Sequence, residues 1–355
     1  MKIVIDARMW NETGIGRYIR NLVLGLEKLD TKNEYYLLLL PDEFENLDLG
    51  QNFHKVLADF NWYTIKEQFR LSQLLNKLSP DLFHSPNINF PVFYTGKMLV
   101  TIHDLIMLKT FEKMNVKRYI KVVLLNITLQ LLRKSTVKII TVSNFVKDEI
   151  ISKLRLKSSK VTVVYNSINF DNSRASFPSD NQRYLIYVGN TYGHKNVRFL
   201  IESIKQINRK LIIVGKEDVS IIRLKDLVNK LGVDHLVVFK GYVDDTELGT
   251  LYSNAFAFVF PTLDEGFGLP GLESMSYRCP VVCTKIKVLQ EIYKDGALFF
   301  KQNNVADLIE KLQFLEDVDN RDKLIKKGIE VLKQYESSSF IKETLKVYYE
   351  LVSYK

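Results

Sequence analysis

Short apolar runs alternate with segments of helical periodicity along the whole chain, and this alternation constrains the fold more than any other feature. It is typical of parallel sheets whose strands are joined by crossover helices. The predicted strands are 2–7, 35–40, 55–58, 81–85, 98–103, 137–142 and 160–165, then 184–189, 210–215, 236–241, 256–261, 280–284 and 297–300. The predicted helices are at about 15–29, 64–78, 114–134, 144–155, 196–207, 245–255 and 338–353. The sequence therefore predicts an α/β protein made of two doubly wound halves.

A polar segment separates the two sets of strands. Residues 171–182 contain Pro178 and follow neither periodicity, which is typical of a linker. With 355 residues and 46% hydrophobic composition, the chain can build two cores. We therefore expect an N-terminal domain at 1–172, a C-terminal domain at 183–337 and a C-terminal helix at 338–355.

The cysteines and the N-terminus indicate the compartment. Cys279 lies just before a predicted buried strand and Cys283 lies within it, and a disulfide framework or a zinc site would need more ligands than this pair. We interpret them as free core thiols, which suits a reducing environment. The N-terminus reads as a strand without the apolar core of a signal peptide. The sequence thus predicts a cytoplasmic protein.

The segment EGFGLPGLE, residues 265–273, is the most informative about function. Pro270 suits the first turn of a helix, so we predict a helix that begins near Leu269 and carries Glu273, with Glu265 on the preceding loop. Glycines at 266 and 268 allow close backbone approach, and the helix N-terminus attracts an anion such as phosphate. Carboxylates on both sides can accept hydrogen bonds from sugar hydroxyls, which indicates a nucleotide sugar. A simpler interpretation is a helix-capping turn with two solvated glutamates.

Further candidates lie where predicted strands end, at the edge where doubly wound sheets bind ligands. Gly14 and Gly16 follow the first strand and could approach a phosphate, although they lack the third glycine of a dinucleotide fingerprint. His103 and Asp104 follow MLVTI, residues 98–102, directly, where a histidine can contact sugar hydroxyls or serve only the structure. Lys195 begins a helix after the strand 184–189, and there it could neutralise a diphosphate or simply be a solvated surface lysine.

Four segments stand in this order along the chain: TIHDL, VGNTYGHKN, GYVDDTEL and FPTLDEGFGLPGLESMSYRCPVV. Together they resemble the retaining glycosyltransferases of family 4, and the resemblance covers nearly the whole chain. Within the family, HKN upstream of the two glutamates is most similar to the bacterial mannosyltransferases of polysaccharide and lipopolysaccharide synthesis. The resemblance implies the GT-B fold, two Rossmann-like domains that face each other across a cleft. It also implies transfer without a metal ion or other cofactor, which agrees with the lack of a paired-aspartate motif.

The resemblance implies a role for each matching residue. His103, with Asp104 beside it, lies near the reacting centre; Glu265 contacts the hydroxyls of the donor sugar; Lys195 contacts the diphosphate. The other donor-binding positions are Glu273 on the ribose, Gly14 and Gly16 near the diphosphate, Gly241, Tyr242 and Leu248 against the base, and Gly266, Phe267, Gly268 and Leu269 around the phosphate and sugar.

Two positions depart from the family pattern. Many members carry Arg where this chain has Asn190, so neutralisation of the diphosphate falls more on Lys195, with help from His194 or Arg17. The usual Pro-Asn-Gly near the linker is here 165–167, Tyr-Asn-Ser. Asn190 favours a different function, a nucleotide-sugar-binding scaffold without turnover. A transferase that uses a UDP- or dTDP-sugar and a purely membrane-bound adaptor are also compatible with the sequence.

Residues 109–160 carry thirteen Lys and Arg against three acidic residues. The difference, a net charge of +10 on this segment, exceeds the formal charge of +9 of the whole chain. Within them 122–132 is apolar and fenced by basic residues, but it is too short to span a bilayer. Either it lies on an anionic membrane surface, which suits a lipid-linked acceptor, or it is a core helix with snorkelling ends. Without a DNA- or RNA-binding motif, we do not expect a nucleic-acid partner.

Overall fold

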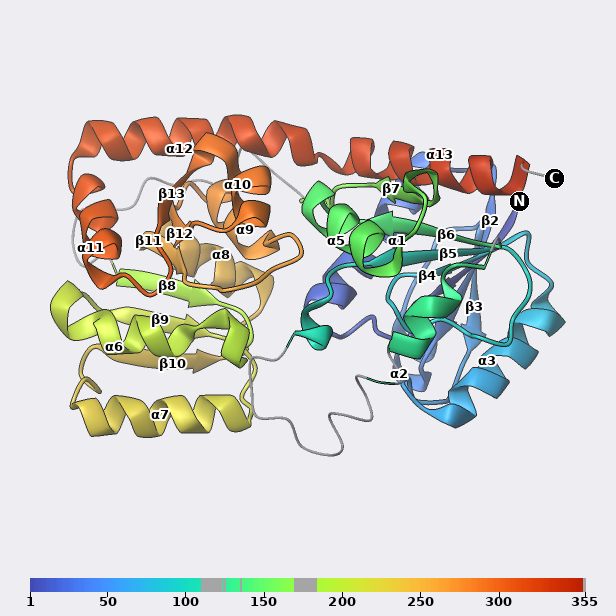
Figure 1. The fold of residues 1–355 in the computed structure, drawn as a ribbon, viewed down its shortest axis with the longest axis horizontal. Helices are drawn as coiled ribbons and strands as arrows, with labels where there is room; N and C mark the ends of the chain where they lie inside the picture. Colours follow the sequence, from blue (N-terminus) through green and yellow to red (C-terminus); the bar gives the residue numbers. More distant parts are fainter. Residues whose placement is uncertain (110–122, 124–125, 135, 169–183, 354–355) are drawn as a thin grey trace. The chain divides into compact units, whose positions relative to one another are not determined.

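The computed structural model describes residues 1–109, 123, 126–134, 136–168 and 184–353 (Figure 1). The chain divides into two compact units. The first comprises Met1–Ser167 and Tyr335–Lys355, and the second comprises Ile168–Gln334. The predicted linker, 171–182, lies outside the described residues.

The first unit contains a parallel sheet of seven strands in the order β3-β2-β1-β4-β5-β6-β7. Its strands are β1 (Lys2–Asp6), β2 (Glu34–Leu39), β3 (Phe53–Leu57), β4 (Leu82–Ser85), β5 (Met98–Ile102), β6 (Val137–Thr141) and β7 (Val161–Val163). All were predicted from the sequence. The strand order reverses between β1 and β4, which makes the ends of these two strands the place where a doubly wound sheet binds ligands.

Helices cover both faces of this sheet. They are α1 (Gly14–Leu29), α2 (Pro41–Asn46), α3 (Ile65–Leu78), α5 (Asn144–Leu154) and α13 (Ser337–Ser353), with short 3₁₀ turns at Ile106–Leu108 and Ser158–Lys160. Helix α2 was not predicted, although Pro41 at its start and Asp42 and Glu43 in its first turn are typical of a helix N-terminus. The predicted helix 114–134 lies largely outside the described residues. Of its described residues, 126–131 are helical.

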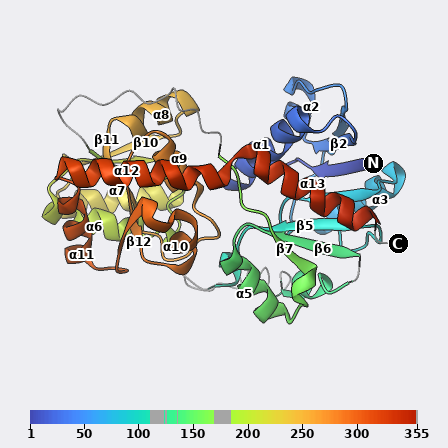
Figure 2. The ribbon, with the colours of Figure 1, turned by 90° about the horizontal axis from the view of Figure 1, so that it is seen from above.

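The two faces of the sheet carry separate hydrophobic cores because successive side chains of a strand point to opposite faces. Ile3 and Ile5 of β1 belong to the cluster formed with α1 and α13, whereas Val4 belongs to the cluster formed with α3 and α5. Helix α13 packs beside α1 (Figure 2). A Cβ atom at Gly25 of α1 would lie 2.5 Å from Cγ1 of Ile341 in α13, so the absence of a side chain permits this contact.

The second unit contains a parallel sheet of six strands in the order β10-β9-β8-β11-β12-β13. Its strands are β8 (Tyr184–Val188), β9 (Leu211–Val214), β10 (Val237–Gly241), β11 (Ala255–Phe260), β12 (Val281–Thr284) and β13 (Ala297–Phe300). Again every strand was predicted. The order reverses between β8 and β11, so the loops after these two strands border the expected ligand site of this unit.

The helices of the second unit are α6 (Val197–Ile207), α7 (Val219–Leu231), α8 (Asp245–Ser253), α9 (Leu269–Ser276), α10 (Lys287–Tyr293), α11 (Val305–Phe314) and α12 (Val318–Leu332), with 3₁₀ turns η4 (Gly193–Lys195) and η5 (Lys294–Gly296). Cys279 and Cys283 are buried free thiols, as predicted. Within the part of the chain that the structure describes, no helix is long and apolar enough to cross a membrane.

Candidate functional site

In the second unit, the loops that follow β8 and β11 are bonded to each other. The carbonyl oxygen of His194 accepts hydrogen bonds from the backbone N–H of Leu263 at 2.7 Å and from the hydroxyl of Thr262 at 3.2 Å. These bonds hold η4 against the start of the segment 262–268. The point where the strand order reverses is therefore a single connected structure.

Lys195 and Glu265 form an ion pair at this point. Each side chain is only 12% exposed, and the Lys195 ammonium also lies 5.4 Å from the ring centroid of Phe260. The second carboxylate oxygen of Glu265 accepts a hydrogen bond from the backbone N–H of Gly266 at 3.2 Å. The structure thus brings together two of the residues that the sequence singled out, one cation and one carboxylate.

Helix α9 begins at Leu269 with Pro270 in its first turn, as predicted. Gly268 precedes it with φ +94°, a conformation that strongly favours glycine. A Cβ atom there would lie 2.5 Å from the hydroxyl oxygen of Tyr293 and 2.7 Å from Cδ2 of Leu289. The space beside the Gly268 Cα thus holds protein atoms, while the predicted contact of its backbone with a donor stays a prediction.

Tyr293, at the end of α10, fixes this loop. Its hydroxyl donates a hydrogen bond of 2.5 Å to the carbonyl oxygen of Gly268. Burial raises the pKa of the Tyr293 hydroxyl well above its ordinary value, so the group stays protonated and keeps donating. Sequence reasoning missed Tyr293, since a tyrosine in a short apolar helix carries no signal of contact with a loop 25 residues away.

The helices differ in whether a side chain caps their N-terminus. Helices α3, α5, α7, α8, α11 and α12 receive side-chain caps, from Thr64, Ser143, Asp218, Asp244, Asn304 and Asp317. Helices α1, α6 and α9 receive none, as do the shorter α2 and α10. Because α1, α6 and α9 follow β1, β8 and β11, these N-termini lie, each within its own unit, after strands that border the points of reversal, although in α9 Pro270 has no N–H and the Gly271 N–H bonds to the Gly268 carbonyl oxygen at 3.2 Å. Uncapped amides at a helix N-terminus suit an anion.

Glu273 and Asn190 flank the Lys195–Glu265 pair in sequence. Glu273 lies partly buried on α9, where its carbonyl oxygen accepts a hydrogen bond from the Ser276 hydroxyl at 2.7 Å. The carbonyl oxygen of Asn190 accepts from the Tyr187 hydroxyl at 2.5 Å, whereas its side-chain Oδ1 is buried with no hydrogen-bond partner among the described residues. A ligand that supplies a partner would remove the cost of that unpaired amide.

Gly241, Tyr242 and Leu248, predicted to contact the base, lie at the end of β10 and on α8 of the same unit. Gly241 has φ +73°, Tyr242 is 82% exposed and Leu248 is partly buried. The phenol ring of Tyr242 is therefore open to stacking. Phe267, by contrast, is only 4% exposed, so its side chain belongs to the core and only its backbone is left for the predicted donor contact.

Lys195 is not assisted by a second positive charge from its neighbour. Burial, and next the charge of Lys195, lower the pKa of His194 to about 4, which makes the imidazole neutral at pH 7. As a neutral group, His194 could assist a diphosphate only by donating a hydrogen bond, so its predicted role stays a prediction.

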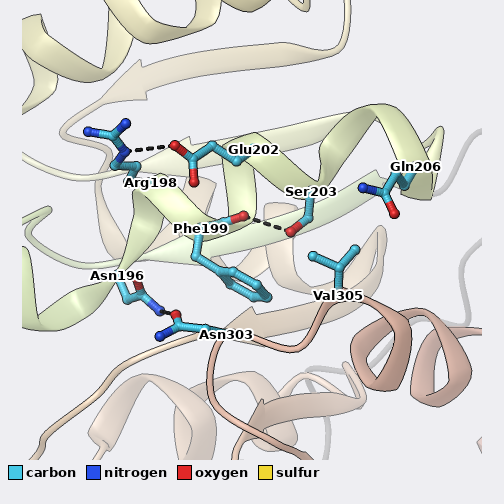
Figure 3. Close-up of a pocket in the computed structure, with 8 residues that line it drawn as sticks. All are labelled: Asn196, Arg198, Phe199, Glu202, Ser203, Gln206, Asn303 and Val305. Atoms are coloured by element: carbon cyan, nitrogen blue, oxygen red, sulfur yellow. Dashed lines mark hydrogen bonds and ion pairs between the residues drawn. The ribbon is translucent and has the colours of Figure 1, made fainter.

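A shallow cavity of about 400 Å³ lies next to this region, along α6 and the start of α11 (Figure 3). Its polar edge contains Asn196, whose amide nitrogen donates to the side-chain oxygen of Asn303 at 2.9 Å. Arg198 and Glu202 pair beside it at 2.7 Å and both point outward. The cavity contains none of the predicted site residues, so we do not assign the donor to it.

In the first unit, His103 and Asp104 follow β5. His103 Nε2 lies 2.8 Å from the carbonyl oxygen of Pro86, and since a carbonyl can only accept, Nε2 carries the proton and Nδ1 is the acceptor. Burial lowers the pKa of His103 to about 4, so the ring is neutral at pH 7. Asp104 accepts a hydrogen bond from the backbone N–H of Ile106 at 2.9 Å, which shapes the turn after β5.

The two glycines of the first unit differ in their surroundings. A Cβ atom at Gly16 would lie 2.5 Å from the carbonyl oxygen of Trp10, so the absence of a side chain permits the close packing of the loop before α1. Gly14, at the first position of α1, has no atom within 4 Å of a Cβ built on it. Of these two glycines only Gly14 has open space beside its Cα, and the contact of either backbone with a diphosphate stays a prediction.

Sequence reasoning missed a buried charged cluster at the end of β1. The Arg8 guanidinium donates to Asp6 at 2.8 and 2.7 Å and to Glu67 at 2.5 Å, and the Asn89 amide donates to both oxygens of Glu67. Two carboxylates against one guanidinium leave a net negative charge at the point of reversal in this unit. Arg8 and Glu67 are 59 positions apart in the sequence, so no local pattern could predict their contact. Over the described residues, no three His, Cys, Asp or Glu side chains gather as ligands of a metal ion.

Comparison with known proteins decides the family. The model "Glycosyltransferase Family 4" matches residues 13–172, and the model "Glycosyl transferases group 1" matches residues 169–331. The chain belongs to the family 4 glycosyltransferases. It is therefore an enzyme of glycosyl transfer, as the resemblance implied.

Curated relatives of this glycosyltransferase include the O-antigen chain mannosyltransferase B of Escherichia coli, 27% identical over 95% of this chain and 96% of the relative. Another is the O-antigen chain mannosyltransferase RfbU of Salmonella typhimurium, 28% identical over 73% of this chain and 72% of the relative. Among solved structures, the sucrose-phosphate synthase of Thermosynechococcus elongatus covers 100% of this chain and 99% of its own with a TM-score of 0.79 at 17% identity. The protein HepE of Anabaena in complex with UDP-glucose covers 99% of this chain and 100% of its own with a TM-score of 0.74 at 14% identity. These structural matches confirm the predicted GT-B fold.

Proposed function

We propose that this glycosyltransferase takes a sugar from a nucleotide diphosphate donor that binds at the reversal point of the second unit. The Lys195–Glu265 ion pair carries this proposal, because it places a cation and a hydroxyl acceptor between two uncapped helix N-termini. Lys195 and the amides of α6 and α9 hold the diphosphate. Glu265 accepts hydrogen bonds from the sugar, Glu273 from the ribose, and Tyr242 stacks on the base.

The chemistry follows from where charge develops during transfer. As the glycosidic bond breaks, negative charge grows on the leaving diphosphate, so groups fixed beside it stabilise the transition state more than the ground state. The positive groups that serve here are Lys195 and helix dipoles, and no metal ion is required for this role. The departing phosphate takes the proton of the acceptor hydroxyl on the same face of the sugar, so the anomeric configuration is retained. Within the first unit, we assign His103 to the hydroxyls of the reacting sugar and Gly14 to a phosphate group, as the family resemblance implies.

We assign mannose from GDP-mannose as the sugar and a growing polysaccharide or lipopolysaccharide chain as the acceptor. The support is the similarity to two O-antigen mannosyltransferases, and the capsular polysaccharide glycosyltransferase CapM of Staphylococcus aureus is a further relative, 27% identical over 59% of this chain. A UDP-sugar is the competing donor, because solved HepE structures hold UDP and UDP-glucose.

A scaffold that binds the donor without turnover is the competing function, and Asn190 is the residue that favours it. An asparagine here brings no positive charge, as an arginine would, and its side-chain Oδ1 is buried without a hydrogen-bond partner among the described residues. The amide can turn its NH₂ group toward a phosphate oxygen and still donate a hydrogen bond. An amide donor at this position therefore supports binding, with less charge neutralisation than arginine gives.

An exposed apolar surface on the first unit supports a lipid-linked acceptor at a membrane. Ile65 and Phe69 on α3 are 78% and 53% exposed, and Phe69 stacks on Phe93, itself 56% exposed, at 4.8 Å between ring centroids. Basic side chains surround this apolar patch: Lys66 and Arg70 are exposed on α3, and Lys134 donates to the carbonyl oxygen of Val92 at 3.2 Å. Apolar side chains within a basic rim suit an anionic lipid surface.

A transfer assay tests the function. The protein is incubated with GDP-mannose, UDP-glucose, dTDP-glucose or ADP-glucose and with a polyprenyl-diphosphate oligosaccharide, and products are identified by mass spectrometry and by the anomeric coupling in NMR. We expect a mannosylated product with an α linkage from GDP-mannose. Transfer from another donor would replace the sugar assignment but keep the function. Tight donor binding without product over many acceptors would favour the scaffold.

A further inference from the structure

A chain of hydrogen bonds crosses the core of the first unit and connects four of its elements. The Tyr348 hydroxyl of α13 lies 2.7 Å from His84 Nδ1 on β4, and His84 Nε2 lies 2.9 Å from the Thr101 hydroxyl on β5. The Thr101 hydroxyl in turn lies 3.0 Å from the Tyr18 hydroxyl on α1. All four side chains are at most 1% exposed, so these polar groups satisfy one another away from water.

This chain ends on His103, which the proposed function places at the reacting sugar. The Tyr18 ring meets the His103 imidazole edge to face, with 4.8 Å between centroids and 81° between planes. On its other side the imidazole donates through Nε2 to the Pro86 carbonyl at 2.8 Å. The ring of Tyr18 therefore sets the plane of His103, and Pro86 sets which nitrogen keeps the proton.

Packing alone does not require these hydroxyl groups. Phe340 of α13 already contacts the Tyr18 ring at 5.4 Å, and the surrounding side chains form a continuous apolar cluster. Placing His84 in an apolar core costs free energy unless both ring nitrogens are hydrogen-bonded. Hydrogen bonds depend on direction, so a fully satisfied polar network holds the Tyr18 ring in one orientation. Apolar contacts alone would leave that orientation less fixed.

We propose that Tyr348, His84, Thr101 and Tyr18 are positioning residues that orient His103 for glycosyl transfer, so that the C-terminal helix α13 takes part in the reaction. The inference rests on the proposed function for the role of His103 and on the hydrogen bonds and ring contact above for the relay itself. Loss of one hydroxyl lets the Tyr18 ring and the imidazole adopt further orientations, which lowers the fraction of enzyme with Nδ1 ready to accept from the sugar. Substrate affinity, which depends mainly on the second unit, is unchanged.

The test uses the full-length protein with Tyr348→Phe and Thr101→Val, each of which removes one hydroxyl and little volume. Tyr349→Phe is the matched control, because this tyrosine is the next residue on α13 and its hydroxyl bonds to Asn33 outside the relay. Thr101→Ser restores the hydroxyl that Thr101→Val removes. We expect Tyr348→Phe and Thr101→Val to lower kcat roughly 10-fold or more with donor KM unchanged, and the control and Thr101→Ser to stay near wild type.

A second readout follows His103 directly. The chain has five histidines, so ¹⁵N-histidine labelling gives few signals, and His103→Asn identifies the one that belongs to His103. We expect the nitrogen shifts of wild type to show the Nε2–H tautomer and those of both relay variants to move toward a tautomer mixture. Unchanged His103 signals in the folded relay variants would overturn the proposal. If Tyr348→Phe does not fold, the comparison of Thr101→Val with Thr101→Ser decides whether the relay orients His103.

The two readouts separate this inference from the proposed function. If wild type transfers no sugar from any donor, the proposed function fails, and the shifts of His103 still show whether the relay orients the ring. If transfer occurs and the relay variants keep wild-type kcat, the relay fails and the function stands.

Discussion

The ammonium group of Lys195 pairs with the carboxylate of Glu265, 70 residues further along the chain, where the strand order of the second sheet reverses. In the absence of a donor each group thus neutralises the other. Under the proposed function, a diphosphate would compete for the ammonium and a sugar hydroxyl for the carboxylate, so donor binding would exchange one ion pair for contacts on both sides of the scissile bond. The pair holds both groups in place before the donor arrives.

Removal of either partner is expected to reduce transfer strongly. Lys195→Met and Glu265→Gln should each lower kcat/KM by roughly 100-fold or more, since each loses a contact that stabilises charge or hydroxyl groups in the transition state. The control is the exposed pair Lys225–Glu217 of the same unit, with side chains 45% and 67% exposed. Lys225→Met and Glu217→Gln should leave initial rates unchanged. Near-wild-type rates in the first two variants would show that the pair serves only the fold.

Gly268→Ala is expected to destabilise the protein more than a positive φ alone explains. Gly232 also has positive φ, at +62°, but has open space around its Cα, whereas at Gly268 the new methyl group would meet Tyr293. Gly232→Ala should cost roughly 1 kcal/mol of unfolding free energy. Urea unfolding of both variants should show a clearly larger loss for Gly268→Ala. Equal losses would mean that Tyr293 moves aside easily.

Tyr293→Phe tests the hydrogen bond that holds the Gly268 carbonyl. The variant keeps the ring and leaves that acceptor unpaired, so we expect a loss of about 1 kcal/mol in unfolding free energy. Because the loop before α9 gains freedom, the donor KM should rise while an exposed control, Tyr242→Phe, keeps wild-type stability. Calorimetric melting and initial rates on the same samples measure both effects. An unaltered melting temperature for Tyr293→Phe would refute the assigned bond.

Stability should fall as the pH is lowered from neutral. Burial lowers the pKa of His84 to about 3, so between its unfolded and folded pKa values only the unfolded chain binds the proton. The stabilisation is complete above about pH 6.5 and is lost as the pH falls, by about 2 kcal/mol between pH 7.5 and pH 5 for this one residue. His84→Gln should show a smaller loss over that interval in urea titrations. Identical pH dependence in both proteins would contradict the neutral state of His84.

The apolar patch on α3 is expected to contact lipid. Phe69→Ser should reduce flotation with vesicles that contain anionic lipid, because it removes apolar area from the patch. Phe314→Ser is the control, a phenylalanine 46% exposed on the second unit. Equal flotation of the wild type with neutral and with anionic vesicles would exclude the patch as a membrane contact. Equal flotation of Phe69→Ser and Phe314→Ser would exclude it as well.

The strands and the start of α9 could be predicted because they depend on local patterns. Apolar runs bounded by polar residues define β1 to β13, and Pro270 after two glycines defines the first turn of α9. Lys195 and Glu265 were singled out because each follows a strand, and the structure brings them together, while their contact with a donor stays a prediction.

Contacts between distant residues could not be predicted in this way. Nothing near Gly268 shows that Tyr293 fills the space beside it, and nothing near Arg8 shows that Glu67 pairs with it. The neutral state of His194 follows from burial, which periodicity does not specify for a loop residue. The relay from Tyr348 to His103 begins with a contact between α13 and β4 whose two residues, Tyr348 and His84, are 264 positions apart in the chain.

Donor titration of three proteins tests the proposed donor site most directly. Wild type, Lys195→Met and Lys225→Met are titrated calorimetrically with GDP, UDP and their sugar conjugates, and the tightest ligand of wild type is compared. We expect Lys225→Met to match wild type and Lys195→Met to bind that ligand at least roughly 10-fold more weakly, since it loses a charge-assisted contact to phosphate. Equal affinity of Lys195→Met and wild type would contradict a donor site built on Lys195 and Glu265.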